Sequence, residues 1–412
     1  MTNQNKIRLV MVDANGNNNK FWFADINGLT VHRKWGRVGY SGQEKTFTYY
    51  DNYEAINDTR RMADSKRAKG YKDIDIVEEN DTIAVAGKDL EQVALDQIDT
   101  GGQKTVQSLI QFLVRKNIHH ITSLTSITYT DGQLKTPLGV VSNKSISKAR
   151  DTLDHMNDLV NNKMVDSGRF SRLVEQYMTL VPTNVGMKLR PAEAFGTTKK
   201  IDDQYELLDA MESVLAGTNG DTMEEIGQIF NVKVRIENDP TAMTQVERRF
   251  RKSINAHHVS SGMRIKSIYT VEMPENDKKF ERNLGNVRLL WHGTKASNLL
   301  SILKSGFKIV PIRSGHTTGR MFGNGLYFTD QSTKALNYAT TFWGGKDEGR
   351  YFMLLCEVAM GKSFTPSSPG EYLPKGYDSI FAKAHVSGVV NNEMISFRES
   401  QVTIRYLVEF SK

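Results

Sequence analysis

Three regions of the chain differ in how their apolar residues are spaced. In residues 6–50, apolar positions alternate with polar ones, as at Ile7 and Leu9, which is typical of strands with one buried face. The Asn27-Gly28 pair lies between two runs of aromatic and β-branched residues and predicts a hairpin turn. A basic helical segment follows over residues 53–69. This region therefore predicts a small antiparallel sheet with one helix.

The spacing becomes helical between about residues 100 and 215, after a looser stretch through Ala84 and Gly87 that predicts a linker. These helical segments contain no cluster of histidine, cysteine or acidic residues of a catalytic kind, so the pattern alone predicts a structural bundle. Three sets of apolar residues each fall on one helical face: Val106, Ile110 and Leu113; Leu153, Met156 and Val160; and Leu173, Tyr177 and Leu180.

From about residue 224, β-rich runs such as IKSIYTVEM, RYFMLLCEVAMG and VTIRYLVEF alternate with helices and glycine-rich loops, which predicts a mixed α+β domain. One of these helices, near Ser297 to Lys304, is expected to stop at Gly306 and to bury Leu299, Leu300 and Leu303. The predicted fold class is α+β multidomain: a small antiparallel β domain, an all-α bundle and a mixed α+β domain. The expected boundaries are 1–86, a linker over 87–97, then 98–218 and 219–412.

Composition indicates a soluble, intracellular protein. The chain has 412 residues, of which 25% are charged, and its mean hydropathy is −0.46. No apolar run is long enough to cross a bilayer, and MTNQNKIRLV lacks the features of a secretory signal. Cys356 is the sole cysteine, which excludes an intramolecular disulfide and a cysteine-based zinc site, and its apolar surroundings predict a buried core residue.

The net charge of +7, with an isoelectric point near 9.1, favours a polyanionic partner such as nucleic acid. A solvated basic surface without a partner is the alternative, and charge alone does not decide between them. The basic residues are dense early in the chain: Arg33, Lys34, Arg37, Lys45, Arg60, Arg61, Lys66, Arg67, Lys69 and Lys72.

Three separated strings in the last region, LLWHGTKASNLLSILKSGF, TGRMFGNGLYFTDQSTKALNYA and NNEMISFRESQVTIRYLVEF, resemble the active-site signature of the poly(ADP-ribose) polymerases. The resemblance places the family's histidine, tyrosine and glutamate on His292, Tyr327 and Glu393. Cleavage of the bond between nicotinamide and ribose leaves positive charge on the sugar, so a carboxylate such as that of Glu393 stabilises the transition state. The same carboxylate would polarise an attacking hydroxyl during chain growth.

The resemblance also implies the residues that bind NAD+. His292 would donate a hydrogen bond to a ribose hydroxyl, and Gly293, which has no side chain, would let the backbone approach the nicotinamide amide. Tyr327 and Tyr338 would flank the nicotinamide ring. The full implied set is His292, Gly293, Thr294, Asn298, Lys308, Tyr327, Ala335 and Tyr338, with Thr294 and Asn298 lining the site and Lys308 near the adenine end.

Three positions depart from the family pattern. Ala335 stands where a serine hydroxyl usually bonds to the nicotinamide amide, so one ligand hydrogen bond is expected to be missing. Asn324 replaces a lysine of the glycine-rich turn, and Asn391 replaces a tyrosine two residues before the glutamate. The last two lie on the expected acceptor side, where they put chain length and branching in question.

The N-terminal region carries the tripeptide Trp35-Gly36-Arg37 in KWGRVGYSGQ, which resembles the WGR domain of the same family. By this resemblance Arg37 would pair with phosphate and Trp35 would stack at a broken DNA end, with Gly36 between these two residues at the DNA contact. Asn19 would add a polar contact. Trp35 as an ordinary core residue is the alternative. The strings TPLGVVSNKSISKA and YMTLVPTNVG resemble the helical regulatory domain of the DNA-dependent members, which implies autoinhibition relieved by DNA.

Together these resemblances imply a DNA-break-activated enzyme of the DNA damage response that consumes NAD+ as a substrate, needs no metal and attaches ADP-ribose to proteins including itself. We expect a monomer when DNA is absent, no membrane association, and a DNA-associated location in either a nucleus or a bacterial cell. Two alternatives stay open: an enzyme of this fold that transfers single ADP-ribose units or hydrolyses NAD+, and a DNA-end scaffold with an inactive catalytic domain. The complete His292, Tyr327 and Glu393 set argues against the scaffold.

Overall fold

The computed structural model describes residues 5–13, 18–37, 42–73, 89–130, 132–136, 139–185, 189–218, 228–309, 321–340 and 349–412. The chain divides into two compact units. One unit consists of residues 1–87 and 120–221, and the other of residues 88–119 and 222–412. The expected domain boundaries near 86 and 219 fall on residues that lie outside the described ranges.

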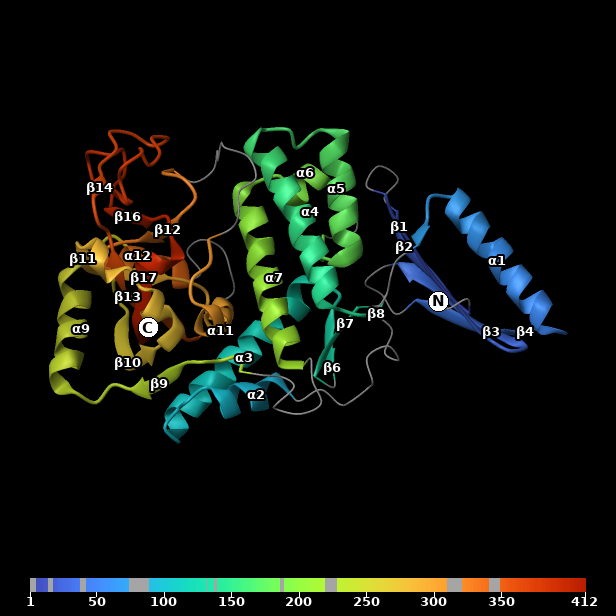
Figure 1. The fold of residues 1–412 in the computed structure, drawn as a ribbon, viewed down its shortest axis with the longest axis horizontal. Helices are drawn as coiled ribbons and strands as arrows, with labels where there is room; N and C mark the ends of the chain where they lie inside the picture. Colours follow the sequence, from blue (N-terminus) through green and yellow to red (C-terminus); the bar gives the residue numbers. More distant parts are fainter. Residues whose placement is uncertain are drawn as a thin grey trace. The chain divides into compact units, whose positions relative to one another are not determined.

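The N-terminal part of the first unit is an antiparallel sheet in the order β4-β3-β2-β1-β5 with helix α1 on one face (Figure 1). Alternation along the strands sends Leu9, Trp22 and Val31 to the face where Ala55 and Ala63 of α1 pack. Gly28 has a φ of +59°, as the hairpin turn requires, and confirms the turn predicted there. The elements are β1 (Lys6–Asp13), β2 (Asn18–Asn27), β3 (Thr30–Arg37), β4 (Gln43–Thr48), α1 (Asn52–Ala68) and β5 (Lys72–Asp73).

The helical region begins earlier than the pattern predicted, because α2 (Leu90–Gln97) forms within the expected linker and buries Leu90, Val93 and Ala94. Helix α4 packs against α5 and α7 in the first unit (Figure 1). A three-stranded antiparallel sheet, which periodicity did not predict, follows α3. The further elements are α3 (Lys104–Leu124), β6 (Thr128–Thr130), β7 (Gln133–Thr136), β8 (Gly139–Val140), α4 (Asn143–Asn161), α5 (Gly168–Leu180), α6 (Pro191–Phe195) and α7 (Thr198–Thr218).

Two of the three predicted helical faces are confirmed, and the third is partly wrong. The residues expected to be buried on α3 and α4 are buried. On α5 the buried residues are Phe170, Val174, Tyr177 and Met178, so the face predicted from Leu173 and Leu180 is offset by about one residue. The offset arises because an aromatic residue in the first turn, Phe170, sets the direction of the buried face.

The second unit contains two sheets, in the orders β11-β13-β17-β10-β9 and β12-β16-β15-β14. An isolated bridge between Trp291 and Thr329 joins them, so the end of β11 lies beside the end of β12. Helices α9 and α12 cover one face of the first sheet, where Phe250 and Leu336 pack against Trp291. The strands are β9 (Lys233–Ile236), β10 (Arg264–Glu272), β11 (Val287–Gly293), β12 (Leu326–Phe328), β13 (Tyr351–Ala359), β14 (Ser363–Phe364), β15 (Ser379–Ala382), β16 (Glu393–Ser396) and β17 (Val402–Ser411).

Helix α11 (Ala296–Ser305) forms where it was predicted, ends at Gly306 and buries Leu299, Leu300 and Leu303. Cys356 is buried, as expected, and burial raises the pKa of its thiol. The other helices of this unit are α9 (Pro240–Lys252), α10 (Pro274–Lys279), α12 (Ser332–Ala339) and the short η1 (Arg282–Leu284) and η3 (Glu399–Gln401).

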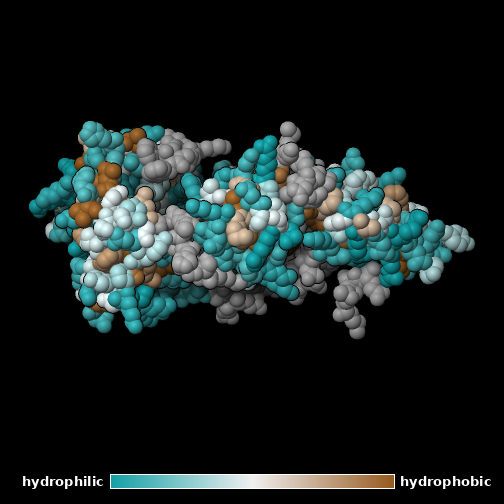
Figure 2. Space-filling view, turned by 90° about the horizontal axis from the view of Figure 1, so that it is seen from above, coloured by the Kyte–Doolittle hydropathy of each residue, from teal (hydrophilic) through white to brown (hydrophobic). Residues whose placement is uncertain are grey.

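The face of the molecule drawn in Figure 2 is mainly hydrophilic, with hydrophobic residues in small groups. Among the described helices, none combines the length and apolarity that a bilayer crossing requires.

Candidate active site

Gly293 ends β11 directly against helix α12. A Cβ added to Gly293 would lie 1.7 Å from the carbonyl oxygen of Ala335, so no side chain fits at this position. Ala335 itself is buried and packs in the same cluster as Trp291. The two positions that the sequence assigned to the nicotinamide amide are therefore neighbours.

His292 and Tyr327 lie together because the Trp291 bridge holds β11 beside β12. The Nδ1 atom of His292 is 3.0 Å from the carbonyl oxygen of Tyr327, and its ring packs edge-on against Phe307, with centroids 4.8 Å apart. Since a carbonyl oxygen only accepts, Nδ1 carries the proton in this contact.

The Tyr327 side chain is held inside the turn that precedes β12. Its hydroxyl donates to the carbonyl of Gly323 (2.8 Å) and accepts from the amide of Phe322 (3.1 Å). Both bonds fix the glycine-rich turn on the strand that follows it. Asn324, one of the departures from the family pattern, lies in this turn and is half-buried.

Glu393 begins β16 and forms an ion pair with Lys334 of α12, and both side chains are 15% exposed. Burial lowers the pKa of Lys334, while the carboxylates of Glu393 and Asp330 oppose that effect. Burial and the charge of Glu393 raise the pKa of the Tyr338 hydroxyl, on the same helix. Helix α12 thus brings Lys334, Ala335 and Tyr338 to a site with Glu393. Lys334 was not among the residues predicted from the sequence, although it lies immediately before Ala335 in the string that resembles the family.

Hydrogen bonds fix the residue before Glu393. The hydroxyl of Thr329 donates to the carbonyl of Asn392 (2.7 Å), and the Asn392 amide donates to Asp330 (2.9 Å). The side-chain oxygen of Asn392 accepts from the amide of Ala384 (2.9 Å). The start of β16 is thereby tied to the segment between β12 and α12.

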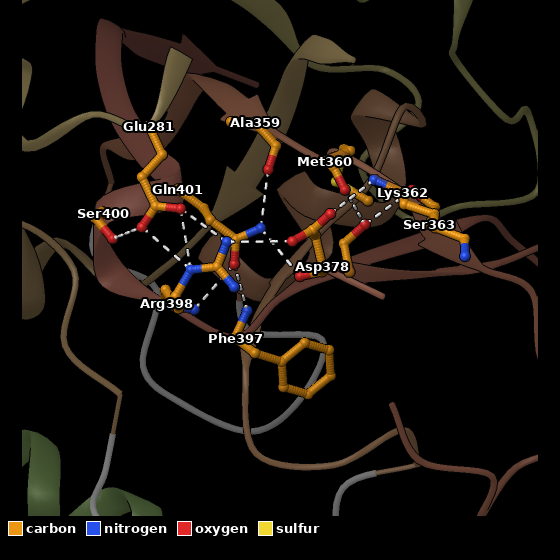
Figure 3. A network of polar contacts seen from close by, with 11 residues as sticks. Glu281, Ala359, Met360, Lys362, Ser363, Asp378, Phe397, Arg398, Ser400 and Gln401 are labelled. Carbon is orange, nitrogen blue, oxygen red and sulfur yellow. Dashed lines mark hydrogen bonds and ion pairs between the residues drawn. The ribbon is translucent and has the colours of Figure 1, made fainter. Parts of the chain in front are cut away.

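A polar network holds the other end of β16 (Figure 3). Gln401 is fully buried, and its Oε1 accepts from the amide of Arg398, while its Nε2 donates to the carbonyls of Ala359 (2.9 Å) and Asp378 (3.1 Å). Arg398 donates to Glu281 at 2.7 and 3.0 Å and lowers the pKa of that carboxyl. The ends of β16 and β13 and the start of β15 are thus joined, which holds Glu393 on a rigid strand.

Thr294 lies just before the first turn of α11, and Asn298 lies within that turn. The side-chain amide of Asn298 donates to the Thr294 hydroxyl (3.1 Å). Lys308 lies beyond the end of the same helix and pairs with Glu399 at 3.1 Å. The structure therefore places Thr294 and Asn298 together, close in the chain to Gly293. Lys308 forms an ion pair with Glu399 of η3. Among the described residues, no group of three or more histidine, cysteine, aspartate or glutamate side chains is arranged to hold a metal ion.

In the N-terminal sheet, the register of β2 and β3 pairs Trp22 with Trp35 and Lys20 with Arg37. Asn19 precedes Lys20, so Asn19 and Arg37 belong to the same end of the sheet. Trp35 is half-buried against the core cluster beneath α1. A Cβ on Gly36 would lie 2.6 Å from the Cα of Gly42, so glycine is required by close backbone packing.

Several of the basic residues that are dense in the first part of the chain bind carboxylates of this same region. Arg33 is 5% exposed and donates to Asp58 at 2.8 Å, and Arg61 pairs with the other oxygen of Asp58. Arg67 pairs with Asp64 and Asp73 at 2.7 Å. Arg33 therefore contributes to neither a polyanion-binding surface nor a solvated basic surface, because its charge is buried within the fold.

Comparison with known proteins assigns all three regions. Residues 5–78 match the WGR domain, residues 103–221 match the poly(ADP-ribose) polymerase regulatory domain, and residues 242–387 match the poly(ADP-ribose) polymerase catalytic domain. Together the matches span most of the chain in a single order, and the chain belongs to the poly(ADP-ribose) polymerase family. The catalytic match contains His292 and Tyr327 and ends before Glu393.

Three relatives illustrate the range of similarity. The chain is 24% identical to poly [ADP-ribose] polymerase of Sarcophaga peregrina, covering 99% of this chain and 46% of the relative. It is 25% identical to poly [ADP-ribose] polymerase 2 of Arabidopsis thaliana, covering 86% and 60%. It is also 23% identical to protein mono-ADP-ribosyltransferase PARP3 of Homo sapiens, covering 97% and 86%. The chain thus spans about half to three fifths of the first two relatives.

Proposed function

We propose that the protein is an ADP-ribosyltransferase that cleaves NAD+, releases nicotinamide and transfers ADP-ribose, and that DNA breaks activate it. The observation that carries the proposal is the arrangement around α12. Ala335 of α12 contacts the backbone of Gly293, and the preceding residue of the same helix, Lys334, is paired with Glu393, a carboxylate that is only 15% exposed. A buried, oriented carboxylate is what a reaction with a developing sugar cation requires.

In the proposed reaction, the bond between the ribose carbon and the nicotinamide nitrogen breaks, and its electron pair leaves with nicotinamide. The positive charge left on the sugar is stabilised by Glu393, while Lys334 fixes the orientation of that carboxylate. The oxygen of an acceptor hydroxyl then bonds to the sugar carbon and loses its proton, which Glu393 is placed to accept. His292 donates a hydrogen bond to a ribose hydroxyl and positions the substrate.

The nicotinamide end of the substrate is assigned to the surface between β11 and α12. Gly293 supplies backbone groups for the amide, and the rings of Tyr327 and Tyr338 flank nicotinamide. Tyr338 is 49% exposed, so its ring is accessible for such stacking. Thr294 and Asn298 line the adjoining part of the site, and Lys308 lies toward adenine.

DNA binding is assigned to the WGR domain, with Asn19, Trp35, Gly36 and Arg37 at the contact. The shared sheet end of Asn19 and Arg37 supports this assignment. In the helical region, buried polar groups such as Asp154, Asn157 and Gln204 interrupt the apolar core. Such a core is favourable for a marginally stable regulatory element that loosens when DNA binds.

Transfer of single ADP-ribose units is the second candidate, favoured by Asn324 and Asn391 on the acceptor side. Nicotinamide release by the purified chain, measured with and without nicked duplex DNA, tests the main proposal, and a product gel distinguishes single units from chains. We expect release to rise with nicked DNA. No release in either condition would contradict the proposed activity, and equal release in both would contradict activation by DNA. Glu393→Gln is the active-site control and should abolish chains.

A further inference from the structure

The start of the helical region is built into the catalytic unit. The Gln97 side chain accepts from the amides of Ile229 (2.7 Å) and Phe230 (3.0 Å), ahead of β9. Gln103 accepts from the amide of Ile236 at 2.9 Å. Residues 88–119 consequently belong to the same compact unit as the catalytic residues.

Helix α3 is anchored further along by an aromatic contact. The guanidinium of Arg350 lies over the ring of Phe112 at 4.4 Å and donates two hydrogen bonds of 2.8 Å to Glu409, which is almost fully buried. The Phe112 ring also packs against Phe352 of β13, with centroids 5.9 Å apart. This first part of α3 is therefore held on the main catalytic sheet.

Asn117 lies on this anchored part of α3 and contacts the helix beside the candidate site. Its side chain is fully buried, and its Nδ2 donates to the carbonyl oxygen of Ser297 at 3.3 Å (Figure 1 shows α3 and α11). Ser297 is in the first turn of α11 and immediately precedes Asn298, whose side chain bonds to Thr294. The residue that Asn117 contacts is therefore adjacent in the chain to Asn298 of the Asn298–Thr294 pair.

The other polar atom of Asn117 adds no stabilising hydrogen bond within the part of the chain that the structure describes. Its Oδ1 is buried and has no hydrogen-bond partner among the described residues. A buried acceptor without a donor destabilises a fold, and an apolar side chain of similar volume avoids that penalty. The contact with Ser297 is thus the polar interaction of this side chain that the structure shows, and a locally unfavourable polar residue of this kind is expected at functional sites.

We propose that Asn117 is a positioning residue for the NAD+ site. Through the Ser297 carbonyl it fixes the first turn of α11, and hence the Thr294 and Asn298 side chains that line the dinucleotide site. This inference rests on the proposed function. By this inference Asn117, a residue of the regulatory region, supports substrate binding. Asn117 belongs to the same compact unit as the catalytic residues.

Calorimetric titration of the full chain, bound to nicked duplex DNA so that the proposed autoinhibition is relieved, with a non-hydrolysable NAD+ analogue and, separately, with benzamide tests the proposal. The expected result for Asn117→Leu is a loss of about fivefold to tenfold in affinity for the analogue, as for one lost hydrogen bond, with benzamide affinity within about twofold. Benzamide imitates only the nicotinamide end of NAD+. Its affinity therefore distinguishes a local displacement of the first turn of α11 from a general loosening of the whole NAD+ site. Asn117→Gln, which keeps the donor, should restore part of the analogue affinity, and Arg115→Ala, an exposed change on the same helix, should alter neither.

Unchanged analogue binding in Asn117→Leu would overturn the proposal, and so would a parallel loss for both ligands. A wild-type chain that binds neither ligand would instead contradict the proposed function. The melting temperature of Asn117→Leu should equal or exceed that of the wild type, because the unpaired oxygen is removed. If Asn117→Leu does not fold, the affinities of Asn117→Gln for the two ligands are compared with those of the wild type. An equal loss of affinity for the analogue and for benzamide in that variant counts against the inference.

Discussion

The carbonyl oxygen of Ala335 occupies the space that a side chain on Gly293 would need, since a Cβ there would approach it to 1.7 Å. Strand β11 and helix α12 therefore meet backbone to backbone. This contact places α12, and with it Lys334 and Tyr338, at a fixed distance from the end of β11. Any larger residue at 293 must displace the backbone of α12 or of β11.

Gly293→Ala should accordingly disable the site while leaving the sheet intact. We expect benzamide affinity and nicotinamide release each to fall by at least about tenfold, because the clash involves backbone that has no rotamer by which to move aside. Isothermal titration and a release assay measure the two effects. Gly262→Ala is the matched control, since a Cβ at Gly262 meets nothing within 4 Å and its φ needs no glycine. Similar losses in both variants would refute the close-packing argument.

The fold class could be predicted because it depends on local patterns, whereas the candidate site positions on β11, β12 and α12 came from the resemblance of three strings to the family's signature. The hairpin at Gly28 and helix α11 follow from residue types within a few positions of each other. The Lys334–Glu393 pair joins residues 59 apart, and only the arrangement of β16 beside β12 and α12 creates it. Likewise the burial of Arg33 depends on Asp58, 25 residues later, so a count of basic residues could not separate structural charges from free ones.

Ala335→Ser should strengthen the binding of benzamide-like inhibitors if Ala335 lies where the family has its serine. A neutral hydrogen bond contributes about 0.5–1.5 kcal/mol, which corresponds to a decrease of roughly twofold to twelvefold in the inhibition constant. Without ligand the new hydroxyl can bond to the carbonyl of Gln331, which already accepts from the amide of residue 335. Inhibition constants measured against NAD+ decide the matter. An unchanged constant would mean that the hydroxyl does not reach the amide.

Lys334→Met should lower turnover more than it lowers substrate affinity. The ammonium of Lys334 holds the carboxylate of Glu393 in one orientation, and both groups are only 15% exposed, so the methionine variant leaves that carboxylate without its partner. We expect nicotinamide release per enzyme to fall at least about tenfold at saturating NAD+, with a smaller change in KM. Lys334→Arg should retain part of the activity. The control is Lys279→Met, at an exposed position that ends α10; full activity in Lys334→Met would show that Glu393 needs no counter-charge.

Asp58 should control the acid stability of the WGR domain. Its carboxylate accepts from the Tyr49 hydroxyl at 2.6 Å, from Arg33 at 2.8 Å and from Arg61 at 2.7 Å, and these bonds lower its pKa far below the ordinary value. A group whose pKa is lower in the folded state stabilises the fold above its unfolded pKa, near 4, and this contribution is lost as the pH falls toward the folded pKa. The stabilising effect of Asp58 is thus complete at neutral pH and declines only below about pH 4.

Asp58→Asn should therefore destabilise the domain at pH 7 by about 3 kcal/mol, because it leaves the buried Arg33 guanidinium without a carboxylate. The difference from wild type should persist from pH 7 to about pH 4 and shrink at lower pH. Scanning calorimetry of the full chain between pH 3 and 7 would follow the transition that belongs to this domain. Asp64→Asn is the control, because its pair with Arg67 is exposed and should contribute about 1 kcal/mol or less. A gap between Asp58→Asn and wild type that widened on acidification would contradict the assigned pKa shift, and equal effects of the two variants would contradict the buried role of Arg33.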